Sequence, residues 1–369
     1  MARAKLTGMY KLLRPLLFAL DPELSHALSF GLLRGAYRVP GLAQLTHACV
    51  GREPPPLPVE AMGLRFPNPL GLAAGLDKNA EYLQPLADFG FGWLELGTVT
   101  PRAQPGNPKP RLFRIPEHEA IINRMGFNNV GVEAFLANLR AQPRFCLLGI
   151  NIGKNRDTPV ERATEDYLSA LRAVYAHADY VAVNISSPNT PGLRALQEGE
   201  ALEPLLAALK REQAALAQKH GRRVPLALKI APDLDDAQIA VIAELVEQHG
   251  FEAVIATNTT LTRPGLPAAL AAESGGLSGR PLKDLSDAVI RKLYAHLHGR
   301  VPIIGVGGVS SAQDAWEKLV AGADLVQVYS ALIFHGPSVV HDIIAGLAAR
   351  VQSSGRANLR EALAQARSR

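Results

Sequence analysis

Eight short apolar segments, each followed by a stretch with helical character, fill this chain from residue 67 onward and constrain its fold more than any other feature. The segments are rich in Val, Ile and Leu, as expected for strands buried on both faces of a parallel sheet. They are Pro69–Ala73, Gly92–Leu96, Cys146–Ile150, Tyr180–Asn184, Leu226–Ile230, Ala253–Ala256, Pro302–Gly305 and Asp324–Val328. The intervening patterns predict helices near 80–89, 129–141, 160–177, 200–220, 235–249, 283–298, 311–321 and 337–351.

Eight such units are the number that closes a (β/α)8 TIM barrel, which takes about 250 residues. The chain has 369, so one barrel leaves room for extensions. An open doubly wound sheet shares the local pattern, but no GxGxxG fingerprint follows the first strand. We therefore predict an α/β fold, a (β/α)8 barrel with a helical extension at its N-terminus.

Small or polar residues stand where each predicted strand ends. They are Gly75 and Lys78, Thr98, Asn151, Asn184, Lys229, Thr257 and Asn258, Gly307 and Gly308, and Tyr329 and Ser330. Because the carboxyl ends of barrel strands surround one mouth, we expect these residues to meet at a single pocket. Two long connections, 98–128 and 258–282, leave from the same side. Connections of this length are typical of lids or ligand-binding loops.

The first 50 residues form a separate helical segment in our prediction. Asp21-Pro22 is a typical helix start, and leucines recur every fourth residue after it, so we expect two helices joined by a turn there. Six basic residues against two acidic ones give this segment most of the net charge of +5. The pattern fits helices packed as ordinary core, and it equally fits an anchor lying in a membrane interface.

The remaining boundaries follow from composition. A proline-rich linker, 54–58, separates the N-terminal segment from the barrel, and a polar tail follows Ser353. We divide the chain into an N-terminal membrane-associating segment (1–50), a barrel (51–353) and a C-terminal surface helix or tail (354–369). The apolar run 9–20 is too short to span a bilayer.

Several kinds of site are disfavoured by the sequence. Cys49 and Cys146 are the two cysteines, without CxxC spacing, which speaks against a disulfide framework and a thiolate zinc site and fits a reducing compartment. The ten histidines are dispersed, so no metal site is predicted. No G-x-S-x-G elbow is present, which disfavours a serine hydrolase.

A phosphate site is predicted beside the last two strands. Gly305–Gly308 ends the seventh strand, and Ser310-Ser311 offers caps for the next helix. Backbone N–H groups exposed by glycine point at anions, and barrels often bind phosphate with these loops. Tyr329-Ser330 and Gly279 complete the predicted cradle.

Lys229 lies at the end of a buried strand and therefore needs an anionic partner. That partner could be a carboxylate such as Asp77, or a flavin ring that gains negative charge on reduction. Lys78 is a candidate clamp for a substrate carboxylate. Five asparagines supply neutral amides at the mouth: Asn123, Asn128, Asn184, Asn189 and Asn258. We expect a small, flat, anionic ligand with amide-like edges.

Several sequence runs resemble those of the class 2, quinone-dependent dihydroorotate dehydrogenases. These runs are AAGLDKN (73–79), NRMGFNN (123–129), NISSPNTPGLR (184–194), LALKIAPD (226–233), ATNTT (256–260), GGLSGRPL (275–282), PIIGVGG (302–308) and LVQVYS (325–330). The resemblance extends over nearly the whole chain. It implies an FMN-containing barrel, with one FMN per chain, that oxidises (S)-dihydroorotate to orotate in pyrimidine synthesis.

The resemblance also implies a role for individual residues. By this resemblance, Ser187 stands at the position of the catalytic base that removes the C5 proton of dihydroorotate. Soluble class 1 enzymes have cysteine at that position. The implied substrate-binding residues are Lys78, Asn123, Arg124, Met125, Gly126, Phe127, Asn184, Asn189, Asn258 and Thr259. The implied FMN-binding residues are Ala74, Gly75, Leu76, Asp77, Lys78, Thr98, Asn151, Asn184, Lys229, Thr257, Gly279, Gly308, Tyr329 and Ser330.

In this class the N-terminal helices open an apolar tunnel through which ubiquinone or menaquinone reaches the flavin. His26, Arg114 and Tyr329 are the implied contacts for the quinone head. The resemblance thus favours the anchor interpretation, with a monomer bound peripherally to the cytoplasmic side of the cell inner membrane. No nucleic acid partner is expected.

Two alternatives remain. Another FMN barrel, such as a dihydrouridine synthase acting on tRNA, would need a broad basic surface, whereas the chain after residue 50 is nearly neutral. A membrane-docked protein that binds flavin or phosphate without turnover would share the site but would not react with dihydroorotate.

Overall fold

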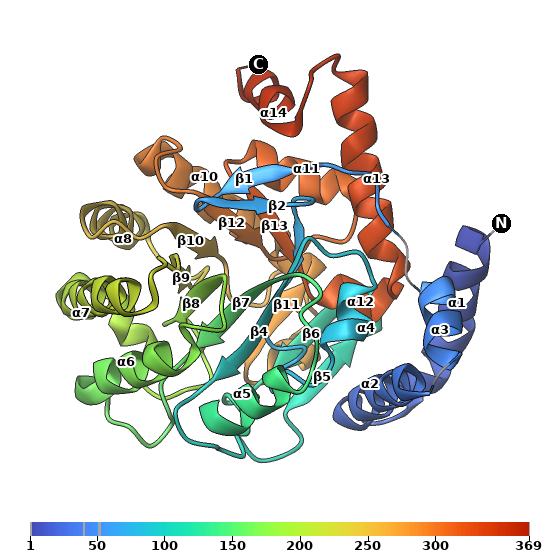
Figure 1. The fold of residues 1–369 in the computed structure, drawn as a ribbon, viewed down its shortest axis with the longest axis horizontal. Coiled ribbons are helices and arrows are strands. Elements are labelled where there is room, and N and C mark those ends of the chain that lie inside the picture. The colour runs from blue at the N-terminus through green and yellow to red at the C-terminus, as the bar shows by residue number, and fades with distance from the viewer. Residues whose placement is uncertain (1, 40, 51–52, 369) are drawn as a thin grey trace.

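The computed structural model describes residues 2–39, 41–50 and 53–368, and its centre is a closed barrel of eight parallel strands (Figure 1). In chain order the strands are β3 (Leu70–Leu72), β4 (Trp93–Val99), β7 (Leu147–Ile152), β8 (Tyr180–Asn184), β9 (Leu226–Ile230), β10 (Ala253–Ala256), β12 (Ile303–Val306) and β13 (Leu325–Val328). The last strand pairs with the first and closes the barrel. The predicted fold class and all eight predicted strands are confirmed.

Glycines make room for large side chains inside the barrel. Trp93 and Tyr180 lie there without exposure to solvent, and the Trp93 Nε1 donates to the Tyr180 hydroxyl at 3.2 Å. A Cβ on Gly71 or on Gly149 would lie 2.2 Å from the Trp93 or the Tyr180 ring, respectively. Alternate residues of each strand therefore fill the interior, and the others pack against the surrounding helices.

A hairpin covers the amino end of the barrel. Its strands are β1 (Val59–Ala61) and β2 (Leu64–Phe66), paired antiparallel. Phe66 is fully buried and meets the Trp93 ring edge-on, with ring centroids 4.9 Å apart. The barrel is thus open for ligands at its carboxyl end. The hairpin is too short to have been predicted from its alternation alone.

Helices surround the barrel where the sequence patterns place them. They are α4 (Leu83–Ala87), α5 (Val132–Arg140), α6 (Ala163–Val174), α7 (Gly199–His220), α8 (Asp236–Gln248), α10 (Lys283–Leu297), α11 (Ala312–Val320) and α13 (Ser338–Ser353). Asp235 forms a capping box with Gln238 at the start of α8, and Ser311 caps α11 as predicted. Short elements that were not predicted are α9 (Ala268–Ala271), α12 (Ser330–His335) and 3₁₀ turns at Pro116–His118, Val160–Arg162, Leu193–Gln197 and Arg280–Leu282.

The two long connections meet in a small antiparallel sheet beside the mouth. Its strands are β5 (Leu112–Ile115), β6 (Ala120–Asn123) and β11 (Gly276–Gly279), in the order β11-β6-β5. Strands of four residues, donated by segments far apart in the sequence, leave little periodic signal. The sheet fixes the position of both connections relative to the mouth.

The N-terminal segment lies at one side of the barrel (Figure 1). The two predicted helices are α1 (Ala2–Ala19) and α2 (Pro22–Arg38), and Asp21 caps α2 through the N–H groups of Glu23 and Leu24. A third helix, α3 (Leu42–Val50), was not predicted. None of the described helices is long and apolar enough to cross a bilayer.

The polar tail ends in α14 (Leu359–Arg367), which is capped by Asn358 and buries Leu359 and Leu363. The predicted segments 1–50 and 354–369 each include residues outside the described part of the chain, namely 1, 40 and 369.

Candidate active site

A cavity of about 1080 Å³ occupies the mouth of the barrel and extends between α1 and α2. The structure brings nearly all predicted site residues to its wall. They are His26, Ala74, Gly75, Leu76, Asp77, Lys78, Thr98, Arg114, Asn123, Met125, Gly126, Phe127, Asn184, Ser187, Asn189, Lys229, Thr257, Asn258, Thr259, Gly279, Gly308, Tyr329 and Ser330. Seven of the eight strand ends reach the cavity. The exception is β7, whose Asn151 is fully buried beneath the cavity.

Two predicted residues do not line the cavity. Asn151 is fully buried below it, where it accepts a hydrogen bond from Thr98 Oγ1 at 2.6 Å. Arg124 points away, forms an ion pair with Glu273 and lies over the Phe113 ring at 4.7 Å. Asn151 therefore contacts the cavity wall through Thr98, whereas the Arg124 side chain is held outside it by Glu273 and Phe113.

The anionic partner of Lys229 is Glu95. Lys229 Nζ lies 3.5 Å from Glu95 Oε1, and Glu95 has no exposed surface. Tyr180 and Gln327 donate to the other carboxylate oxygen at 2.7 and 2.8 Å. These contacts supply hydrogen-bond partners for the buried carboxylate, which holds the Lys229 ammonium at the floor of the cavity.

Asp77, which the sequence suggested as one possible partner for Lys229, does not pair with it. Its carboxylate accepts the backbone N–H groups of Glu81 and Tyr82 at 2.9 and 2.8 Å, and so shapes the turn after β3. Burial raises the pKa of Asp77 to about 6, and these hydrogen bonds oppose the rise. A charged residue inside the apolar run WLELGTV was the signal for Glu95 that the sequence analysis missed.

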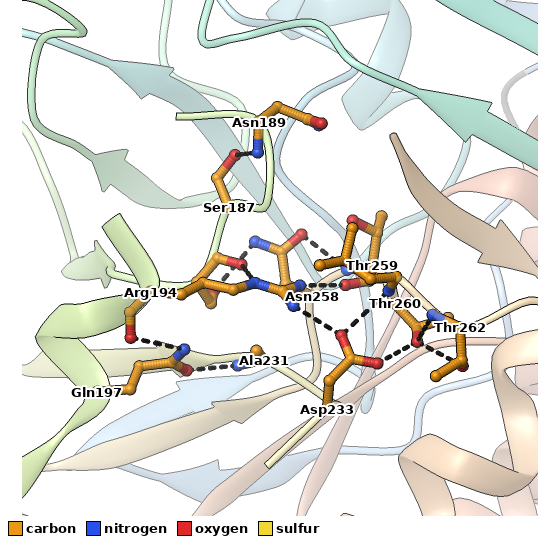
Figure 2. Close-up of polar contacts among 12 residues, drawn as sticks. Ser187, Asn189, Arg194, Gln197, Ala231, Asp233, Asn258, Thr259, Thr260 and Thr262 are labelled. Carbon is orange, nitrogen blue, oxygen red and sulfur yellow. Dashed lines mark hydrogen bonds and ion pairs between the residues drawn. The ribbon is translucent and has the colours of Figure 1, made fainter. Parts of the chain in front are cut away.

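Ser187 lies on the loop after β8, and its hydroxyl is buried at the cavity wall. Ser187 Oγ accepts the backbone N–H of Asn189 at 3.3 Å (Figure 2). No histidine or carboxylate bonds to this hydroxyl among the residues that the structure describes. Ser187 therefore lies at the cavity wall with no side-chain general base among the described residues beside it.

Arg194 fixes this loop to its neighbours. Its guanidinium donates to the Ser186 carbonyl at 3.1 Å and to the Thr259 carbonyl at 2.8 Å, and it pairs with Asp233 at 2.7 Å (Figure 2). The loops after β8, β9 and β10 are thus connected through one side chain. Sequence reasoning missed Arg194 and Asp233 because both look like solvated surface charges.

Side-chain amides form a network across the mouth. Asn258 Nδ2 donates to Ser186 Oγ at 3.0 Å and to Asn184 Oδ1 at 3.3 Å, and Asn184 Nδ2 donates to Thr98 Oγ1 at 3.1 Å. Asn189 Nδ2 reaches the Asn123 carbonyl at 3.1 Å. These contacts hold the amides in fixed orientations, which suits a ligand with carbonyl and ring N–H edges.

Among the basic side chains that line the cavity wall are Lys78, His26 and Arg114. Burial lowers the pKa of Lys78 to about 8, although Glu23 partly offsets this, so Lys78 is a cation at neutral pH. Burial also lowers the pKa of His26, whose Nε2 lies 2.8 Å from the Leu76 carbonyl. Arg114 donates to the carbonyls of Leu17 and Phe18 at the end of α1.

The glycine cradle predicted for phosphate is present beside β12 and β13. Gly307 and Gly308 have φ angles of 121° and 71°, and a Cβ on Gly308 would lie 2.7 Å from the Lys283 backbone nitrogen. Ser278 and Ser330 hydroxyls lie 3.1 Å apart at the same wall. Only glycine fits this loop, which therefore presents its backbone to the cavity.

Comparisons with known proteins agree with this geometry. The family model described as Dihydroorotate dehydrogenase matches residues 56–351. A Thiobacillus denitrificans protein named dihydroorotate dehydrogenase (quinone) is 58% identical over 343 residues, covering 92% of this chain and 99% of its own. A Chromobacterium violaceum protein of the same name is 58% identical over 348 residues, covering 94% and 99%.

Two solved structures of dihydroorotate dehydrogenases have the same overall fold as this chain. A crystal structure of DHODH from Eimeria tenella in complex with ferulenol superimposes with a TM-score of 0.85 at 38% identity, covering 93% of this chain and 95% of that one. The ligand-free form from the same organism gives a TM-score of 0.83 at 39% identity, covering 93% and 98%.

Proposed function

This chain belongs to the dihydroorotate dehydrogenase family, and on that premise we propose that it oxidises dihydroorotate to orotate for pyrimidine synthesis, with bound FMN and a membrane quinone as final electron acceptor. The observation that carries the proposal is the single cavity in which Ser187, the amide network and Lys229 face the same space. Relatives named for this activity share more than half of their residues with this chain over almost their full length.

The cavity fits FMN. Thr257 Oγ1 and Gln327 Oε1 are buried at its wall and have no hydrogen-bond partner among the residues that the structure describes, so a polar ligand edge would satisfy both. Gly279, Gly308 and Ser330 would hold the phosphate, and Lys229 would face the ring. When bound, FMN would supply the hydride acceptor for C6 of dihydroorotate.

Lys78 and the amides would orient the substrate. The Lys78 ammonium would bind the substrate carboxylate, while Asn123, Asn189 and Asn258 would bond to the ring amide groups. With the ring fixed in this way, Ser187 would take the C5 proton. A serine hydroxyl is a weak base, so a water or hydroxyl in the closed site must accept the proton in turn.

The proposal predicts how orotate binding depends on pH. Lys78 in the free protein has a pKa of about 8, and only its protonated form attracts a carboxylate. The Kd of orotate is therefore expected to stay constant below about pH 8 and to rise about tenfold per pH unit above it. Titration of the holoenzyme with orotate across this range measures the change. Lys78→Gln should bind weakly with no such rise, and a wild-type profile without a rise above pH 8 would remove Lys78 from the carboxylate site.

The apolar side of the cavity suits a quinone. Leucines of α1 and α2 surround its outer part, and His26, Arg114 and Tyr329 are the polar residues that we propose near the quinone head. Exposed leucines continue over the surface of both helices, and Lys11, Arg14 and Arg38 flank them. We propose that this surface lies in the cytoplasmic face of the cell inner membrane.

Vesicle binding tests this surface. Leu16 and Leu32 are 68% and 73% exposed, and replacing either with Glu should weaken binding to anionic vesicles by about tenfold. Cosedimentation with vesicles measures this. Leu261→Glu is the matched control, because Leu261 is 53% exposed but lies on a barrel loop. If all three variants lost the same affinity, α1 and α2 would not be the membrane surface.

The first experiment is anaerobic addition of dihydroorotate to the yellow holoenzyme. Dihydroorotate should bleach the flavin absorbance, and a quinone added afterwards should restore it. A protein that binds flavin without turnover would stay yellow, as would a flavin barrel acting on tRNA. A fully loaded protein that is not bleached would exclude the dehydrogenase function.

A further inference from the structure

Arg111 joins helix α2 to the loop that follows β4. Its side chain is 8% exposed and makes a bidentate ion pair with Glu23 in the first turn of α2, at 2.8 and 2.9 Å. Its third nitrogen, Nη1, donates to the carbonyls of Pro105 and Asn107 at 2.6 and 2.9 Å. One buried guanidinium thus binds the N-terminal helix on one side and the turn 105–107 on the other.

The turn 105–107 in turn contacts the predicted substrate site. The Asn107 backbone N–H donates to the Met125 carbonyl at 3.0 Å. Its side-chain Nδ2 donates to the carbonyls of Arg124 at 2.9 Å and Asn189 at 3.3 Å. Asn189 belongs to the loop of Ser187, whose hydroxyl its N–H contacts. The contacts therefore run without a break from α2 to Ser187.

This path has little room for adjustment. A Cβ on Gly106 would lie 2.2 Å from the Met125 carbonyl oxygen and 2.9 Å from Arg111 Nη1. A Cβ on Gly126 would lie 2.8 Å from Asn107 Cγ. Because close-packed groups move together, a shift of Arg111 would displace the substrate-binding segment rather than be absorbed.

We propose that Glu23 is a positioning residue for dihydroorotate oxidation, acting through Arg111 and Asn107 on the segments that carry Met125, Asn189 and Ser187. Helix α2 is then a structural part of the dihydroorotate site as well as of the proposed quinone tunnel. The inference rests on the proposed function, because it assigns α2 a role in binding that substrate.

The charge of Glu23 alone would act in the opposite direction. Glu23 lines the cavity near Lys78, and its negative charge opposes binding of an anion. Removing that charge without moving any atom would therefore tighten orotate binding. Loss of positioning would weaken it, so the sign of the change separates the two effects.

The experiment compares orotate binding by wild-type and Glu23→Gln holoenzymes. It is done at about pH 6, well below the pKa of about 8 of Lys78, so that Lys78 is protonated in both. We expect the Kd of orotate to rise about five- to tenfold in E23Q, as for substitutions within a coupled network. Flavin reduction by dihydroorotate should slow, and Tm should fall because buried Arg111 loses its carboxylate partner. FMN content and reoxidation by a water-soluble quinone should not change.

Arg34→Gln is the matched control. Arg34 ties the same helix to the barrel through Glu81, at 3.1 Å, but has no contact with the turn 105–107. R34Q should bind orotate as the wild type does. Asn107→Ala should weaken orotate binding, and adding E23Q to it should weaken binding little further.

Several outcomes would overturn the inference. Unchanged or tighter orotate binding by E23Q would show that charge dominates. An equal loss in R34Q would show that any loosening of α2 has the same effect. Additive losses in the double variant would show that Glu23 does not act through Asn107. A wild-type holoenzyme that fails to bind orotate would instead overturn the proposed function, and this inference with it.

Discussion

Ser187→Ala is expected to slow flavin reduction by dihydroorotate by about 10²- to 10⁴-fold, the usual contribution of general base catalysis. The Kd of orotate should change only a few-fold, because the one contact of Ser187 Oγ among the described residues is a long one, 3.3 Å, with the Asn189 N–H. Anaerobic stopped-flow absorbance measures the reduction rate, and a static titration measures the Kd.

Ser186→Ala is the matched control for this variant. Ser186 Oγ donates to Asn184 Oδ1 and accepts from Asn258 Nδ2, both at 3.0 Å, so it orients two proposed substrate ligands. S186A should therefore weaken orotate binding more than S187A does, and slow reduction less. If S187A lost rate and affinity in equal measure, Ser187 would be a structural residue.

Lys229→Met is expected to lower the free energy of unfolding by about 3–5 kcal/mol, the usual result of removing one partner of a buried ion pair. Glu95 would stay fully buried with only neutral donors around its carboxylate. Denaturant unfolding at a fixed FMN concentration measures the loss. The same variant should also slow flavin reduction, because no cation would face the ring.

A second substitution tests the physical reason. Adding Glu95→Gln to K229M removes the unpaired charge but keeps a hydrogen-bonding side chain, so it should recover part of the lost stability. Arg172→Met is the control, because Arg172 pairs with Glu212 at the surface and such pairs are worth at most about 1 kcal/mol. A loss in K229M no larger than that in R172M would contradict the importance of the buried pair.

The barrel was predictable because its signal repeats. Each strand of the barrel is an apolar run with a small or polar residue at its end, and each lies within a few residues of the predicted range. The sheet β11-β6-β5 was not predictable, because its strands have four residues each and β6 pairs with β11, a segment more than 150 positions away. Pairing over such distances is decided by tertiary contacts rather than local pattern.

The sequence predicted which residues line the candidate site but not which side chains they contact. Strand ends and resemblance gave the residues on the cavity wall. They did not show that Asn151 lies below the wall, that Arg124 points to Glu273, or that Lys229 pairs with Glu95. Each of these depends on side-chain direction and on a partner from a distant segment, and a single sequence carries no signal for either.

The hairpin of β1 and β2 covers the end of the barrel opposite the cavity. Its turn residue Gly63 is exposed, with open space around it, and the hairpin blocks the barrel axis below Trp93. A chemical tether attached at Gly63 would lie far from the cavity at the mouth of the barrel. An enzyme immobilised through this turn would be attached in one orientation, with the mouth of the barrel facing away from the support.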